Sequence, residues 1–139
     1  MHYPDLTQKL KVYVKATYKD YWKDFFIQNM KKVDYLEGQD DILEELYYFS
    51  KMDKVNEGEF IVRDSEPCKF IYLIGKGKVE MQILDKQKGD AHILDALYKG
   101  SIIGMYNVIM EEAFLYSAKS VDTCIIFKVE KTILESKYF

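Results

Sequence analysis

The stretch from Gly100 to Ala118 reads Gly-Ser-Ile-Ile-Gly-Met-Tyr-Asn-Val-Ile-Met-Glu-Glu-Ala-Phe-Leu-Tyr-Ser-Ala. Two glycines four residues apart flank an apolar pair, and a short, mostly apolar run follows them. Because glycine adopts backbone conformations that other residues avoid, Gly104 favours a turn from a strand into a short helix. The start of such a helix presents free backbone N–H groups, which can bind an anion such as a phosphate.

The side chains of this stretch do not suit a phosphate. No Lys or Arg lies between Gly100 and Ala118, and the two charged residues there, Glu111 and Glu112, would repel an anion. A buried phosphate without a counter-charge costs several kcal/mol. The backbone and the side chains of this stretch therefore indicate different functions.

Composition narrows the class of protein. The 139 residues, 48% apolar and 31% charged, predict one soluble globular protein with a sizeable core. A net charge of −3 gives no overall attraction to nucleic acid. Cys68 and Cys124 are too few for a disulfide framework or a zinc site, and neither a membrane-spanning apolar run nor a signal peptide is present. We predict an intracellular, cytoplasmic protein with no cofactor, no metal, no nucleic-acid partner and no membrane span in this chain.

Residues 1–32 are predicted to form an N-terminal helical arm. Pro4 and Asp5 favour a helix start, and apolar residues recur every four positions as far as Met30. Seven lysines against three aspartates give this arm a charge of +4, while the remainder of the chain carries −7. Because aromatic residues alternate with lysines here, we predict that five of them bind a protein partner or a parent assembly, with core packing as the alternative: Tyr18, Tyr21, Trp22, Phe25 and Phe26.

One domain is predicted after this arm, over residues 33–139. It comprises a leading helical segment over 33–50, a β-roll over 51–130 and a C-terminal helix stub over 131–139. From Met52 the apolar residues take period two in short runs separated by glycine turns. Residues 86–90 indicate a hairpin loop between strands at 81–84 and 91–97, and residues 118–129 indicate one further strand or two. The fold class is therefore mainly β with flanking helices, as a small β-roll or jelly roll.

Several of these segments resemble the cyclic nucleotide-binding domain family. Gly58-Glu59-Phe60-Ile61-Val62-Arg63-Asp64 is similar to the family's "G-E-x-I" strand turn, and Phe70-Ile71-Tyr72-Leu73-Ile74 with Gly77-Lys78-Val79-Glu80 is similar to the strand pair that follows it. The similarity begins near Val33 and continues through Gly100 and Ser117 to Val129. The resemblance implies that family's β-roll, in its double-stranded jelly-roll form.

The resemblance also implies that the stretch from Gly100 is the family's phosphate-binding cassette. In the family, "F-G-E" supplies a Glu for the ribose, and "P-R-A-A" supplies an Arg for the cyclic phosphate. Here Ile103-Gly104-Met105 and Ala113-Phe114-Leu115-Tyr116 take these places, so that Met105 replaces the Glu and Phe114 replaces the Arg. The degenerate ligand-binding cassette is predicted to consist of Gly100, Ile103, Gly104, Met105, Tyr106, Phe114, Leu115, Tyr116 and Ser117.

Met105 and Phe114 cannot make the contacts that the Glu and the Arg make in the family. We therefore predict that Met105, Tyr106, Phe114, Leu115 and Tyr116 fill the site with their own side chains, or else line an apolar pocket for an uncharged ligand. The predicted function is a non-catalytic regulatory or interaction module of the cyclic nucleotide-binding type that does not bind cAMP or cGMP in the usual way. The alternative is a divergent cyclic-nucleotide sensor of a cation channel or a kinase regulator, which would bind cAMP or cGMP.

No catalytic residue is predicted. The sequence contains no nucleophile–base pair, no paired Cys/His spacing and no P-loop. Asp40-Asp41 and Glu44-Glu45 are explained better as charges of a solvated helix face than as acid–base pairs.

Overall fold

The computed structural model describes residues 21–33, 40–85 and 87–138. The chain divides into two compact units, residues 1–47 and 48–139, which are considered separately. This division falls within helix α2 (Asp40–Phe49). The predicted boundary after residue 32 stays a prediction.

In the first unit, residues 21–30 are helical, and their apolar stripe is buried. Phe26 and Met30 are fully buried, as are Leu43 and Leu46 of α2. The Phe26 ring lies 5.5 Å from the Tyr47 ring. Two ion pairs connect the helical segments, Lys23 to Glu44 at 2.7 Å and Lys31 to Asp40 at 3.0 Å.

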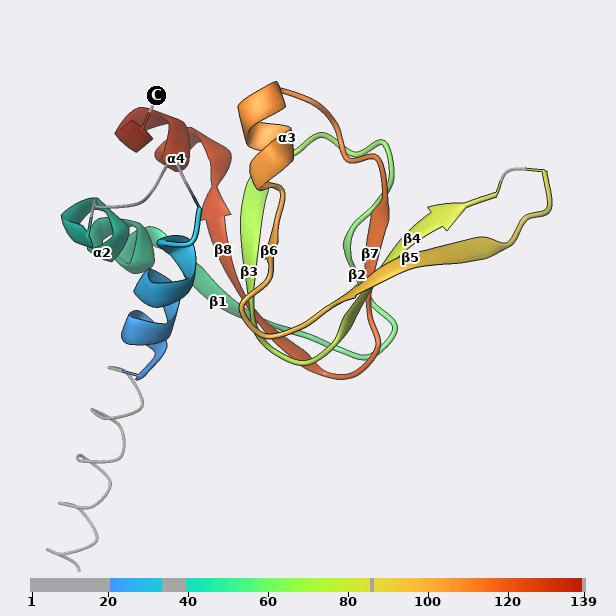
Figure 1. Cartoon of the computed structure of the whole chain (residues 1–139), viewed down its shortest axis with the longest axis horizontal. Helices are drawn as coiled ribbons and strands as arrows, with labels where there is room; N and C mark the ends of the chain where they lie inside the picture. Colours follow the sequence, from blue (N-terminus) through green and yellow to red (C-terminus); the bar gives the residue numbers. More distant parts are fainter. Residues whose placement is uncertain (1–20, 34–39, 86, 139) are drawn as a thin grey trace, which may run out of the picture. The chain divides into compact units, whose positions relative to one another are not determined.

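The second unit consists of two four-stranded antiparallel sheets (Figure 1). One sheet has the order β1-β8-β3-β6 and the other β2-β7-β4-β5. The strands are β1 (Lys51–Val55), β2 (Phe60–Val62), β3 (Phe70–Lys76), β4 (Val79–Leu84), β5 (Ala91–Leu97), β6 (Ile102–Ile103), β7 (Ser117–Ser120) and β8 (Cys124–Glu130). The helices α3 (Met105–Met110) and α4 (Lys131–Tyr138) complete the unit. The predicted fold class is confirmed.

The core forms where the strands are richest in branched apolar residues. β3 and β8 occupy the middle of the first sheet, and Leu73, Ile74, Ile126 and Phe127 are almost completely buried. Strands buried in this way stabilise the roll by removing apolar surface from water. β1 is exposed over its first four residues, as suits the edge strand of that sheet.

The predicted hairpin between 81–84 and 91–97 is confirmed, because β4 pairs with β5 from Val79–Leu97 to Leu84–Ala91. The region predicted as one strand or two over 118–129 contains two, β7 and β8, separated by Val121-Asp122-Thr123. This turn is held by the Asp122 carboxylate, which accepts a hydrogen bond from the Lys78 backbone N–H at 2.8 Å.

Candidate functional site

The cassette contains a sharp turn at Gly104, between β6 and α3. Gly104 has φ +99° and ψ −7°, and its carbonyl accepts the Val108 N–H of α3 at 3.0 Å. A Cβ at this position would lie 3.0 Å from the Phe70 carbonyl oxygen. Backbone conformation and crowding therefore both demand glycine here, and the predicted strand-to-helix turn is confirmed.

We expect Gly104→Ala to lower the free energy of unfolding by about 1–3 kcal/mol from backbone strain alone, with a further loss from the crowded Cβ. The matched control is Gly58→Ala, because Gly58 also has positive φ, +84°, but has nothing within 4 Å of a built Cβ. Chemical denaturation of both variants measures the difference. Equal losses would show that the close approach of Phe70 to Gly104 contributes nothing.

Met105 and Phe114 lie inside the cassette rather than on its surface. Phe114 is 2% exposed and Met105 is 9% exposed. The Phe114 ring also meets the Tyr116 ring edge-on, at 6.0 Å between centroids. Met105 and Phe114 take the positions at which the family has Glu and Arg. Their burial agrees with the prediction that they fill the site.

The backbone on either side of the Phe114 ring is fixed by the turn after β2. The Phe114 N–H donates to the Glu66 carbonyl at 3.0 Å, and the Ser65 N–H donates to the Phe114 carbonyl at 2.8 Å. Ser65 itself has φ +72°, a conformation that costs a non-glycine residue about 1–3 kcal/mol. The surrounding structure thus holds a strained turn against the segment that carries Phe114.

Ser117 and Arg63, the only arginine of the chain, lie beside this turn. The Ser117 Oγ accepts the Asp64 N–H at 2.9 Å, so this hydroxyl supports the turn. The Arg63 guanidinium lies over the Phe60 ring, 4.2 Å from its centroid, and the Lys119 ammonium lies 5.7 Å from the same centroid. Both cations therefore lie within reach of a cation–π contact with Phe60.

Two residues predicted to fill the site do not do so. Tyr106 is 57% exposed and Leu115 is 64% exposed, so the prediction that they fill the site is wrong, whereas the alternative that they line an apolar pocket stays a prediction. Tyr116 is half-buried, whereas Ile103 is fully buried and pairs with Tyr72. Gly100 donates its N–H to the Ile74 carbonyl at 2.8 Å, which makes it a turn residue before β6.

Asn107 was not predicted, and it connects α3 to the loop that follows this helix. Its side chain is 3% exposed, and its Nδ2 donates to the Ala113 carbonyl at 2.9 Å. The Asn107 carbonyl also accepts the Glu112 N–H at 3.0 Å. A lone amide in an apolar helical run is the signal that could have identified this residue, since a buried amide requires partners.

A cluster of weak acids beside the cassette was also missed. The Cys68 Sγ lies 3.7 Å from the Gly104 carbonyl oxygen and 3.4 Å from the Phe70 carbonyl oxygen. Burial raises the pKa of the Cys68 thiol, partly offset by Lys131. Burial, followed by the charges of Cys68 and Glu66, raises the pKa of Tyr72 to about 12, and burial followed by Cys68 raises the pKa of Tyr116. These groups are therefore held neutral and protonated at neutral pH.

The raised pKa of Tyr72 predicts a loss of stability in alkali. The folded state favours the neutral phenol, so its contribution is complete below pH 10, the ordinary pKa, and is lost as the pH rises towards about 12. Tyr72→Phe should therefore lose less stability than the natural protein between these limits, as measured by urea unfolding at each pH. Tyr106→Phe, at an exposed position, is the control. If the free energy of unfolding falls equally with pH in the natural protein and in Tyr72→Phe, ionisation of Tyr72 is not the cause of the loss.

The described residues hold neither a metal site nor a membrane-spanning helix. Within residues 21–33, 40–85 and 87–138, no three His, Cys, Asp or Glu side chains gather in a way that could hold a metal ion. Among the same residues, no helix combines the length and the apolar character needed to cross a membrane.

The predicted partner-binding aromatics of the N-terminal helix separate into different environments. Trp22 and Phe26 are buried, so they are core side chains here and not exposed anchors. Tyr21 is 44% exposed, Phe25 is half-buried, and Tyr18 lies outside the described residues. Partner binding through this helix stays a prediction, for which Tyr21 is the most accessible described ring.

Comparison with known proteins places this geometry in a family. The family model described as "Cyclic nucleotide-binding domain" matches residues 52–138, which include the whole cassette and both sheets except Lys51 of β1. No curated protein matches the chain significantly.

Solved structures share the fold at low sequence identity. The sensor domain of the transcriptional regulator DNR from Pseudomonas aeruginosa is 18% identical, with a TM-score of 0.71 over 84% of this chain and 78% of that one. The regulatory domain of Toxoplasma gondii PKA with cAMP is 12% identical, with a TM-score of 0.75 over 84% and 44%. The regulatory subunit of a cAMP-independent protein kinase A from Trypanosoma brucei, as a triple mutant bound to cAMP in its A site, is 19% identical, with a TM-score of 0.69 over 84% and 43%. The chain thus spans less than half of the two kinase regulatory chains.

Proposed function

Since the chain belongs to the cyclic nucleotide-binding domain family, we propose that it is a non-catalytic regulatory module whose cassette is closed by its own side chains. Such a module binds neither cAMP nor cGMP in the family's usual way. It acts through contacts with a protein partner or with a larger intracellular assembly. A kinase regulator and a channel are two classes of assembly to which the fold would be suited.

The burial of Phe114 carries this proposal. The resemblance puts an arginine at this position in family members that bind the cyclic phosphate, and here the position holds an apolar ring that is 2% exposed. A charge-assisted hydrogen bond contributes roughly 1.5–3 kcal/mol, so each one lost weakens binding about tenfold to a hundredfold. Met105 removes the expected ribose contact in the same way, and Glu111 and Glu112 add no compensating positive charge.

The Trypanosoma brucei structure supports the proposal that a few side chains decide whether this fold binds cAMP. That regulatory subunit belongs to a cAMP-independent kinase, and the variant bound to cAMP carries three substitutions, one of which introduces an arginine. A related fold can therefore occur in a cAMP-independent regulator, and a few substitutions accompany cAMP binding there. We infer the equivalent relation for Met105 and Phe114 in this chain.

A second candidate function is a divergent sensor of cAMP or cGMP. The retained Gly104 turn favours it, because this turn positions the N–H groups at the start of α3. The Toxoplasma gondii regulatory domain, of the same fold, is bound to cAMP. The burial of Met105 and Phe114 argues against a sensor, because the family has a Glu and an Arg at these two positions.

Thermal unfolding with and without nucleotide separates the two candidates. A ligand at one hundred times its dissociation constant stabilises the folded state by about 2.7 kcal/mol. In a chain of this size that gain raises the melting temperature by several degrees. We expect millimolar cAMP or cGMP to leave the melting temperature unchanged, with ATP as the control for non-specific effects. A specific rise with either cyclic nucleotide would establish the sensor instead.

A further inference from the structure

The β4–β5 hairpin extends beyond the rest of its sheet (Figure 1). It carries exposed aliphatic side chains. Ile93 is 62% exposed and Leu94 is 53% exposed, and Leu84 on the facing strand is also exposed. Among the described strands β5 is an edge strand, with β4 as its neighbour. An exposed apolar edge is a template for another strand, and natural proteins usually cover or block it.

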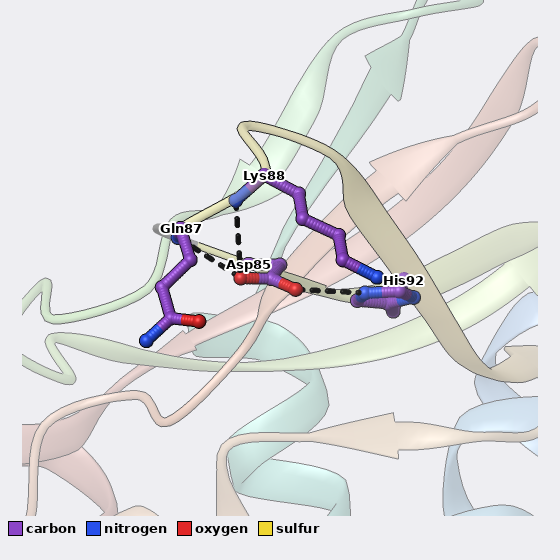
Figure 2. Close-up of polar contacts among 4 residues, drawn as sticks. All are labelled: Asp85, Gln87, Lys88 and His92. Atoms are coloured by element: carbon purple, nitrogen blue, oxygen red, sulfur yellow. Dashed lines mark hydrogen bonds and ion pairs between the residues drawn. The ribbon is translucent and has the colours of Figure 1, made fainter.

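The hairpin is held in shape by its own turn (Figure 2). The Asp85 carboxylate accepts the backbone N–H groups of Gln87 at 2.9 Å and Lys88 at 3.3 Å. Its second oxygen lies 3.5 Å from His92 Nε2, at the start of β5. The Asp85 N–H also donates to the Asp90 carbonyl at 2.8 Å. An arm held by such bonds loses less conformational entropy on docking than one without them.

The sequence of β5 is complementary to itself when two copies run antiparallel. Ala91-His92-Ile93-Leu94-Asp95-Ala96 can be placed against a second copy about an axis between Ile93 and Leu94. In this register each His92 faces the second copy's Asp95, and each Ile93 faces the second copy's Leu94. Ala91 and Ala96 face one another at the two ends. A twofold contact of this kind satisfies both partners with the same residues.

A β-bulge lies at the centre of this register. Pairing between β4 and β5 passes from Met81–Asp95 to Gln82–Ile93, which leaves Leu94 without an opposite residue on β4. A bulge bends a strand and redirects a side chain. The Asp95 carboxylate also accepts the Ala96 N–H at 2.8 Å, a bond that would be exchanged when another strand arrives. The contact therefore consists of side-chain pairs around the bulge with short ladders on either side, and it is weak.

We propose that the β4–β5 hairpin is a self-association arm that joins two copies of this chain through antiparallel β5 strands. Protonated His92 carries an N–H donor on each ring nitrogen, one towards Asp85 and the other, in this register, towards the second copy's Asp95. The arm needs no nucleotide and no cassette contact, so it does not depend on the proposed function. A contact of this size predicts a dissociation constant between micromolar and millimolar.

Charge variants of β5 test the register by analytical ultracentrifugation of the whole chain over a range of concentrations. Asp95→Lys places a lysine opposite His92, and His92→Glu places a glutamate opposite Asp95. We expect each variant alone to dimerise at least about tenfold more weakly than the natural protein, because two favourable pairs become unfavourable. An equal mixture of the two variants should recover dimers, since the introduced glutamate of one copy then faces the introduced lysine of the other.

Recovery on mixing cannot arise from a folding defect, because it requires the two variants to meet. Glu57→Lys, an exposed site in the turn between β1 and β2, is the matched control and should dimerise like the natural protein. A natural protein that stays monomeric at millimolar concentration would overturn the proposal. Variants that associate as strongly as the natural protein, or a mixture no more associated than its components, would also overturn it.

Discussion

Replacing Phe114 with alanine is expected to lower the free energy of unfolding by about 3–5 kcal/mol, the usual cost of removing a fully buried phenylalanine ring. The ring is 2% exposed and lies against Tyr116, so its loss leaves a cavity beside the cassette. The hydrogen bonds of the Phe114 backbone to Ser65 and Glu66 prevent the segment from simply closing over that space. Urea unfolding measures the change.

Leu115→Ala is the matched control for this substitution. Leu115 is the next residue along the chain but is 64% exposed, so its truncation should change the free energy of unfolding by less than about 0.5 kcal/mol. A small loss for Phe114→Ala, comparable to that of the control, would mean that the ring does not close the cassette.

The second large effect concerns the double variant Met105→Glu with Phe114→Arg, which restores the two charged side chains of the family's cassette. Without nucleotide we expect this variant to be less stable than the natural protein, because each buried charge loses hydration without a suitable partner. With cAMP the guanidinium can form charge-assisted hydrogen bonds to the cyclic phosphate, and the glutamate can accept the ribose hydroxyl. We therefore expect cAMP to raise its melting temperature by several degrees at saturating concentration.

Two single variants make this experiment specific. Met105→Glu alone adds only negative charge and should not respond to cAMP, whereas Phe114→Arg alone should respond weakly. A folded double variant that shows no response to cAMP would contradict the view that these two side chains are what closes the site. The predicted absence of cAMP binding would then have to come from the rest of the cassette.

Periodicity and glycine placement predicted most of the fold. The change to period two at Met52 and the hairpin signal at 86–90 depend on local properties, and the structure has a strand from Lys51 to Val55 and a hairpin formed by β4 and β5. The turn at Gly104 was predictable from the glycine itself, because glycine readily adopts the positive φ that the structure has there. These features are decided by residues close together in the sequence.

Side-chain direction within the cassette was harder to predict. Tyr106 follows Met105 in a helix, where neighbouring residues point about 100° apart, so one is buried and the other is exposed. Leu115 follows Phe114 in the bend before β7, where Phe114 is buried and Leu115 is exposed. The apolar character of these residues alone therefore predicted too many side chains inside the site.

Contacts between distant segments were missed for a different reason. Cys68 is 36 residues from Gly104, and only the fold brings its sulfur near that carbonyl. The same holds for the turn at Ser65 that fixes Phe114. In the N-terminal helix, the aromatic stripe suited an exposed docking face and a buried one equally well, and the sequence did not indicate that Trp22 and Phe26 are the buried rings.

Isothermal titration of the natural protein with cAMP and with cGMP tests the central claim most directly, because it measures binding without any assumption about stability. The double variant Met105→Glu with Phe114→Arg, titrated under the same conditions, provides the positive comparison. We predict no saturable binding heat with either nucleotide up to millimolar concentration. The reason is that Phe114 stands at the position where the family has the arginine that binds the cyclic phosphate. Saturable one-to-one binding of cAMP or cGMP to the natural protein would contradict the account and identify it as a sensor.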